Sequence, residues 1–237
     1  MPVYQLNRAH VFPDPREAHS SGIIAVGGDL HPERVLQAYY AGIFPWYSED
    51  SPLYWYSPDP RFLLQTDSLK LQRSLKKRIR RGDYRITLDT AFDRVLQGCA
   101  TVDRPDQDGT WLTQPLQSAF RVLHTHGFAH SVEAWRGDEL VGGLYGVTIG
   151  RIFCGESMFA TASDASKVAF AHLVRQLERW QYPVVDCQVH TPHLERFGAR
   201  EVPREHFLAV LHELRTQPGI PGPWAFDADL GPHEVAG

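Results

Sequence analysis

The chain has 237 residues, enough for one or two domains with a sizeable buried core. Its hydrophobic fraction of 43%, charged fraction of 22% and net charge of −4 are those of an ordinary globular protein. No apolar stretch approaches the roughly 20 residues that cross a bilayer, and the N-terminus lacks a signal-peptide pattern, so we expect a cytoplasmic protein that does not bind membranes.

Residues 1–62 are rich in Pro, Gly and aromatic side chains. We expect one short helix there, beginning near Pro32 and ending at Gly42, because Pro favours the first turn of a helix and Gly the position after its end. Regular elements alternate after this segment. The sequence therefore predicts a small N-terminal domain over residues 1–62 and a larger domain over residues 63–237.

Aromatic side chains interleaved with prolines follow that helix, in segments 42–47 and 54–61, and another Trp stands in segment 109–112. Prolines keep such segments extended. Exposed rings beside a basic surface would suit an unpaired nucleotide, whose base stacks on a ring for ~1–3 kcal/mol. The alternative is burial between domains, and for Trp55 and Tyr56 we favour it.

Segment 70–81 contains seven basic residues and no acidic one: Lys70, Arg73, Lys76, Lys77, Arg78, Arg80 and Arg81. At about 100° per residue, Leu71, Leu75 and Ile79 share one face of a helix and most basic side chains occupy the other. Because the rest of the chain is acidic, this cationic face indicates a positioned phosphate contact. From this feature alone we favour the alternative, a solvated surface helix whose Lys and Arg side chains serve solubility.

Strands are predicted at 84–88, 129–135, 140–149, 151–159, 183–189 and near 200, and helices at 91–99, 114–126, 165–180, near 194 and at 204–214. The order β-α-α-β-β-β-α-β-α-β matches the GNAT type of acyltransferase fold, an α+β protein whose mixed sheet splays open to admit an acyl donor and an amine. Segment 158–167 contains no glycine, so the pyrophosphate cradle of a coenzyme A donor is missing. We expect the tail, residues 218–237, to be poorly ordered.

Asp186 and Gln188 stand two residues apart in an apolar, β-branched strand. Side chains at such positions face the same side, roughly 7 Å apart. Burying a carboxylate is unfavourable unless partners satisfy it, so the pair is our candidate reaction centre. The alternative, in which both merely bond neighbouring backbone, fits the strand equally well.

Cysteine and histidine positions predict neither disulfides nor a metal site. Cys99, Cys154 and Cys187 are odd in number and lack a Cys-x-x-Cys spacing. No helical His-x-x-x-His pair with an acidic neighbour occurs among the five candidates, His124, His126, His130, His190 and His193.

Several segments together resemble the leucyl/phenylalanyl-tRNA–protein transferase family. They cover most of the chain between about residues 22 and 207 and comprise residues 25–30, 42–46, 55–61, 109–112, 130–133, 139–146, 153–159, 165–167 and 186–189. The resemblance implies transfer of Leu or Phe, and conceivably Met, from aminoacyl-tRNA to proteins that begin with Arg or Lys. The product would carry an N-degron, and neither a cofactor nor a membrane would take part.

The resemblance also implies roles for individual residues. Trp46 and Trp111 would meet the terminal adenosine, and Phe153 and Glu156 would belong to the aminoacyl site, while Asp186 and Gln188 would act at the attacking amine. An aminoacyl ester is already activated, so the enzyme needs only to align the amine and remove its proton. Gln188 would position the amine at least as much as accept its proton, because an amide is a weak base.

Two further sets complete the expected site. The amino-acid pocket would include Leu144, Leu173 and Leu177, which stand where some relatives carry Met or Phe. The tRNA backbone would meet Lys70, Arg73, Lys77, Arg80 and Arg81. We expect a monomer. The alternatives are a tRNA-dependent enzyme of peptidoglycan synthesis, which would need a basic acceptor site, and a non-catalytic RNA-binding module, which would leave Asp186 and Gln188 unexplained.

Overall fold

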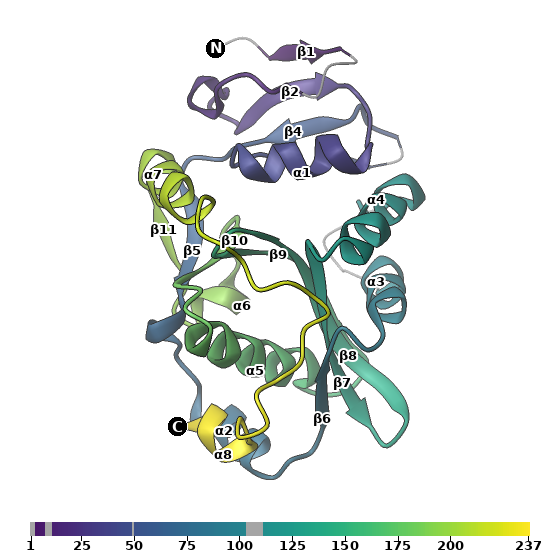
Figure 1. Cartoon of the computed structure of the whole chain (residues 1–237), viewed down its shortest axis with the longest axis vertical. Helices are drawn as coiled ribbons and strands as arrows, with labels where there is room; N and C mark the ends of the chain where they lie inside the picture. Colours follow the sequence, from purple (N-terminus) through teal and green to yellow (C-terminus); the bar gives the residue numbers. More distant parts are fainter. Residues whose placement is uncertain (1–2, 8–10, 49, 103–110) are drawn as a thin grey trace.

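The computed structural model describes residues 3–7, 11–48, 50–102 and 111–237. Over these residues the strands form two mixed sheets, of four and seven strands (Figure 1). The chain is thus a mixed α and β protein. The predicted division at residue 62 stays a prediction, although the larger sheet takes its first strand from Arg61 onward.

The smaller sheet has the order β1-β2-β4-β3. Its elements are β1 (Tyr4–Leu6), the 3₁₀ turn η1 (Pro15–Glu17), β2 (Ile23–Gly27), α1 (Pro32–Tyr40), β3 (Phe44–Pro45) and β4 (Tyr54–Tyr56). Helix α1 begins at Pro32 as predicted, and Gly42, at φ +76°, takes the left-handed conformation that turns the chain into β3. Figure 1 shows α1 between the two sheets, where it contacts β3 and β8.

The larger sheet has the order β11-β5-β10-β9-β8-β7-β6. Its strands are β5 (Arg61–Gln65), β6 (Arg85–Leu88), β7 (Ala129–Arg136), β8 (Glu139–Ile149), β9 (Ile152–Ala160), β10 (Val184–Gln188) and β11 (Arg200–Val202). The helical elements are η2 (Thr66–Ser68), α2 (Arg73–Arg80), α3 (Phe92–Thr101), α4 (Gln114–Thr125), α5 (Ala165–Arg179), α6 (Pro192–Glu195), α7 (Arg204–Leu214) and α8 (Pro232–Ala236).

The predicted element order between residues 84 and 214 is confirmed, but β5 was not predicted. This strand is short and follows a Pro-rich segment, so local patterning gave it no signal of its own. Helix α5 packs against β7, β8 and β9 from one side of the sheet, whereas α3 and α4 cover the other (Figure 1). Each apolar face of the sheet is thereby buried.

Strands β9 and β10 run parallel but pair only over Ile152–Cys154 and Val184–Asp186. Beyond these residues the two strands diverge, so their backbones leave room for side chains and a cavity between them. The divergence is what places the site described below.

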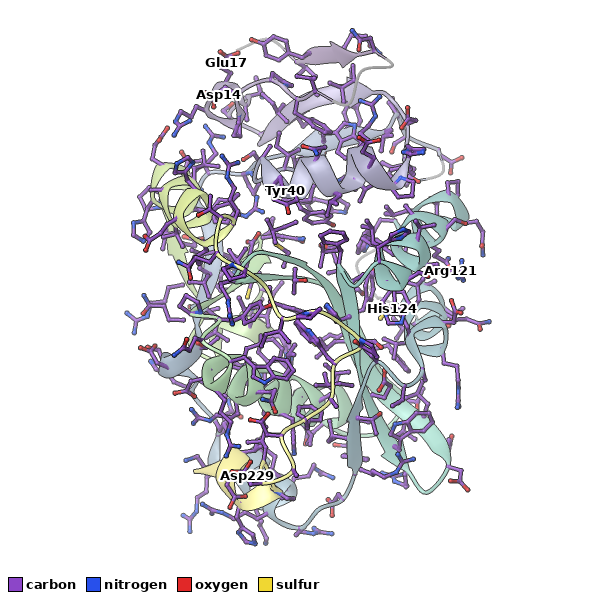
Figure 2. The ribbon with its side chains drawn as sticks, viewed as in Figure 1. Asp14, Glu17, Tyr40, Arg121, His124 and Asp229 are labelled. Atoms are coloured by element: carbon purple, nitrogen blue, oxygen red, sulfur yellow. The ribbon has the colours of Figure 1, made fainter. Side chains whose placement is uncertain are left out.

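The expectation that residues 218–237 are poorly ordered is wrong. Trp224 is buried, its ring stacks on His130 at 3.6 Å between centroids, and its Nε1 donates to the Ile220 carbonyl at 3.0 Å. Further along, Asp229 accepts from Arg179 at 2.8 Å, near the end of the molecule that carries α8 (Figure 2). Burial of one large aromatic ring outweighs the Pro and Gly content of the tail.

Trp55 is fully buried and its Nε1 donates to the Gly27 carbonyl at 2.9 Å. The preference for a packing role is therefore confirmed for this ring. Tyr56 is half-buried beside Phe44 and Trp46.

Candidate active site

Asp186 is fully buried and forms a two-point ion pair with Arg61. Arg61 Nε donates to Oδ1 at 2.8 Å and Nη2 to Oδ2 at 2.6 Å. Both carboxylate oxygens are thus occupied, and Asp186 lines neither of the cavities that flank Gln188. Asp186 is therefore placed to hold its neighbours in position rather than to meet a substrate amine.

Arg61 was not among the residues singled out in the sequence. Its Nη1 donates to the Gly42 carbonyl at 3.1 Å, and its guanidinium lies 4.2 Å from the ring centroid of Phe207. The residue therefore ties the turn after α1 to strand β10. One signal could have found it: a buried carboxylate needs a cation, and Arg61 heads a short apolar run.

Gln188 departs from the regular strand that the sequence predicts. A bulge in β10 shifts the register, so that Asp186 pairs with Leu63 and Gln188 with Phe62, and Gln188 takes the left-handed conformation at φ +63°. Such a conformation costs about 1–3 kcal/mol in a residue with a side chain. Asp186 offsets that cost, because its Oδ1 accepts from the Gln188 backbone N–H at 2.9 Å.

The bulge turns the Gln188 amide toward β9, where Nε2 donates to Glu156 Oε1 at 2.6 Å. Burial raises the pKa of Glu156 to about 7, although the neighbouring Tyr39 hydroxyl and the Gln188 amide act in the opposite direction. A carboxylate with this pKa can accept or release a proton near neutral pH. Tyr39, which is also buried, reaches the site from α1.

Two cavities meet at Glu156 and Gln188. The larger, of about 280 Å³, lies between β9 and β10 and ends among apolar side chains, namely Leu144, Phe153, Met158 and Phe170. The smaller, of about 100 Å³, is walled by aromatic side chains, namely Phe44, Trp46 and Trp111. Trp111 and Val189 border both. A polar pair at the junction of an apolar and an aromatic cavity is the arrangement expected where two parts of one ligand meet.

The structure brings together most of the residues expected for the site: Trp46, Trp111, Leu144, Phe153, Glu156 and Gln188. It does not place Leu173 or Leu177 there, which corrects that expectation. Both are fully buried on α5, and Phe170 borders the cavity from that helix instead. A helix rises about 1.5 Å per residue, so the two leucines lie about 4.5 and 10 Å further along its axis.

The basic segment forms the shorter helix α2, with Leu75 and Ile79 buried. Lys70, Arg73 and Lys77 are exposed and have no ion-pair partner among the described residues. Arg80 donates to the Gly237 carbonyl at 2.8 Å, and Arg81 pairs with Asp83 at 3.2 Å. The segment thus has three free cations within the described structure, Lys70, Arg73 and Lys77, here called the free side of α2, and two, Arg80 and Arg81, that are engaged within the protein.

Within the described ranges no three His, Cys, Asp or Glu side chains are grouped to hold a metal ion. His124, for example, lies on α4 (Figure 2), where it stacks on Phe92 and bonds the Ala129 carbonyl. None of the helices in the described part of the chain is long and apolar enough to cross a membrane.

Known proteins resemble this chain over most of its length. The family model described as leucyl/phenylalanyl-tRNA protein transferase matches residues 63–212, and the model of its N-terminal domain matches residues 28–59. A leucyl/phenylalanyl-tRNA–protein transferase of Anaeromyxobacter sp. (strain Fw109-5) is 54% identical over 228 residues, 96% of this chain and 97% of the relative. The enzyme of the same name from Myxococcus xanthus (strain DK1622) is 52% identical over 98% of this chain and its own full length.

A solved structure, that of L-PGS from Bacillus licheniformis, gives a TM-score of 0.39 at 10% identity. It covers 57% of this chain and 49% of that one, and a similarity so low supports no conclusion.

Proposed function

The chain belongs to the leucyl/phenylalanyl-tRNA protein transferase family, and from that premise we propose how its site performs aminoacyl transfer. The enzyme is an aminoacyltransferase that moves Leu or Phe from aminoacyl-tRNA to the α-amino group of a protein. We propose that the acceptor begins with Arg or Lys and that the product carries an N-degron. The observation that carries the mechanism is the Glu156 and Gln188 pair at the junction of the two cavities.

The two cavities fit the two ends of the donor. The apolar cavity suits the Leu or Phe side chain, because Leu144, Phe153 and Phe170 among its lining residues would make apolar contacts with it. The aromatic cavity suits the terminal adenosine, whose base would stack on Trp46 or Trp111. With both ends held, the ester carbonyl would lie at the junction, beside Glu156.

The reaction is aminolysis of an ester. The amine nitrogen bonds to the carbonyl carbon, the bond from that carbon to the ribose oxygen breaks, the nitrogen loses a proton and the ribose oxygen gains one. Glu156 suits the proton transfer better than Gln188, because a carboxylate with a pKa of about 7 is a stronger base than an amide. Gln188 would hold the Glu156 carboxylate in place.

Asp186 and Arg61 affect the reaction indirectly, through the position of Gln188. They fix the strained backbone of Gln188, and Arg61 links it to the turn at Gly42 that leads to Trp46. This would keep the adenosine cavity and the proton acceptor at a constant separation, which alignment of two reactants requires.

The remaining features of the proposal follow from this chemistry. No cofactor is needed, because the ester is already activated. The donor places the enzyme in the cytoplasm, and we propose that it acts as a monomer of two domains, residues 1–62 and 63–237. The divergence of β9 from β10 supports a GNAT-like arrangement of the larger domain.

The test is transfer of labelled Leu from Leu-tRNA to a peptide that begins with Arg. Label should enter this peptide, but neither its N-acetylated form, which lacks the nucleophile, nor a peptide that begins with Asp. Binding of Leu-tRNA without any transfer would contradict the proposal and indicate an RNA-binding protein.

A further inference from the structure

Besides the apolar and aromatic cavities of the site, a third cavity, which is polar and has a volume of about 100 Å³, lies at the start of α2. It lies beside the apolar cavity, which we have assigned to the aminoacyl side chain and call the aminoacyl cavity. Its walls come from three places: the segment that leads into α2, the start of α5, and the residues around α6. His193 borders both this cavity and the aminoacyl cavity. The two spaces are therefore neighbours that share one side chain.

The charge of this cavity is positive. Lys70, Lys167 and Arg196 line it, against one carboxylate, Asp164. Asp164 is already neutralised, since it accepts from Lys167 at 2.6 Å and from Arg78 at 3.1 Å. Lys70 and Arg196 have no ion-pair partner among the residues that the structure describes.

Polar groups without a partner belong to residues that line the same space. The first turn of α2 supplies Ser74 and Leu75, whose backbone N–H groups have no acceptor within the helix, and its N-cap Gln72 makes no side-chain capping bond. His193 also lines the space, and its Nε2 is buried without a partner in the described structure. Burial, followed by the charges of Lys167 and Arg196, lowers the pKa of His193.

Side-chain cations and the N–H groups at the start of a helix, grouped around one space, favour a single acceptor with several oxygens. Phosphate supplies such oxygens and carries negative charge, which the N-terminus of a helix favours. The space, about three times the roughly 30 Å³ that one water occupies in the liquid, admits one phosphoryl group. A carboxylate has fewer oxygens than the donors here require.

We propose that the cavity lined by Lys70, Ser74, Lys167, His193 and Arg196 binds a phosphate group. The identity of its occupant rests on the proposed function: it is a backbone phosphate close to the aminoacylated end of the tRNA. Through His193 the cavity adjoins the space for the aminoacyl group, and through Lys70 it leads to the free side of α2. A strand leaving the reaction centre would thus be held first at one phosphate in this cavity and then along the helix.

The test uses short RNA strands with the 3′ sequence of the acceptor end, each carrying one uncharged methylphosphonate linkage at a different position. For the full-length protein, one linkage near the 3′ end should weaken binding about tenfold, the loss of one charge-assisted contact. The Arg196→Gln protein should bind the unmodified strand more weakly by a similar factor. The methylphosphonate linkage at that same position should then cause no further loss of affinity. Lys70→Gln, a second variant at an exposed position, should give the same non-additive result.

Arg94→Gln is the matched control, because Arg94 is an exposed arginine on α3, on the other side of the sheet. It should leave the linkage dependence as in the unaltered protein. Titration with inorganic phosphate is the second arm. Saturable binding that Arg196→Gln abolishes, without any linkage effect, would support a site for free phosphate.

If neither arm depends on Arg196, the proposal is overturned. Transfer from leucyl-adenosine, which contains no phosphate, is measured with the unaltered protein in parallel. Its absence would count against the proposed function, whereas the linkage result concerns the phosphate site only.

Discussion

Arg61 and Asp186 stand 125 residues apart in the chain, yet they form a two-point ion pair in which both side chains are buried. The pair joins β5 to β10 at the place where β10 bulges and Gln188 takes a left-handed conformation. A buried pair is stabilising only with good geometry, and here both carboxylate oxygens are used. The local strain at Gln188 is thus held by a contact between distant parts of the sequence.

Breaking this pair should destabilise the fold as well as slow the reaction. Asp186→Asn leaves the Arg61 charge buried without its counter-ion, so the free energy of unfolding should fall by about 3–5 kcal/mol. Urea unfolding and single-turnover transfer check both effects. The double variant Arg61→Gln with Asp186→Asn should lose much less stability than the sum of the single variants. If the Asp186→Asn protein and the unaltered protein unfolded at the same midpoint urea concentration, this account would be contradicted.

Glu156 as proton acceptor predicts a specific pH dependence. The carboxylate must be deprotonated to accept the proton of the amine, so the single-turnover rate should rise as pH increases through about 7 and level off above it. Glu156→Gln should lower the rate about 10²- to 10⁴-fold and abolish this rise, with little change in donor binding. If the variant kept the same pH profile, the titrating group would lie elsewhere.

Tyr39 on α1 affects the pKa of Glu156. Because the Tyr39 hydroxyl lowers the pKa of Glu156, Tyr39→Phe should move the midpoint of the pH–rate profile above 7 and reduce the rate most at neutral pH. Tyr40→Phe is the matched control, because Tyr40 is half-buried on the same helix (Figure 2) and is not among the groups that shift the pKa of Glu156. Identical midpoints in both variants would argue against the assignment.

Phe170 and Leu173 allow a test of the amino-acid cavity. Phe170 borders it and Leu173 does not. Phe170→Ala should lower kcat/KM for Leu-tRNA more than for Phe-tRNA, since the larger side chain refills the space, and the ratio should change by about 10- to 200-fold at most. Leu173→Ala should instead lower the free energy of unfolding by about 2–5 kcal/mol and leave the ratio unchanged.

Arg73 and Lys77 lie on the free side of α2, whereas Arg81 pairs with Asp83. If the free side contacts tRNA phosphates, Arg73→Gln and Lys77→Gln should each raise KM for aminoacyl-tRNA and reduce the slope of log Kd against log salt by about 1. Arg81→Gln should change both less. Equal effects of all three changes would indicate only a diffuse electrostatic attraction.

Elements whose signals are local could be predicted from the amino-acid sequence. The apolar periodicity and the Pro and Gly boundaries gave α1, α7 and the strand and helix order from residue 84 to 214, because these signals act within a few residues. The resemblance pointed to Trp46, Trp111, Phe153 and Glu156, which the structure places around one pair of cavities.

Features that depend on contacts between distant parts of the chain could not be predicted in this way. The partner of Asp186, the bulge at Gln188 and the order of the tail all rest on side chains that meet across the fold. Leu173 shares the helical face pattern of Phe170 yet lies too far along α5 to border the cavity. Periodicity reveals which face of an element is buried, but only packing fixes where along its axis a cavity lies.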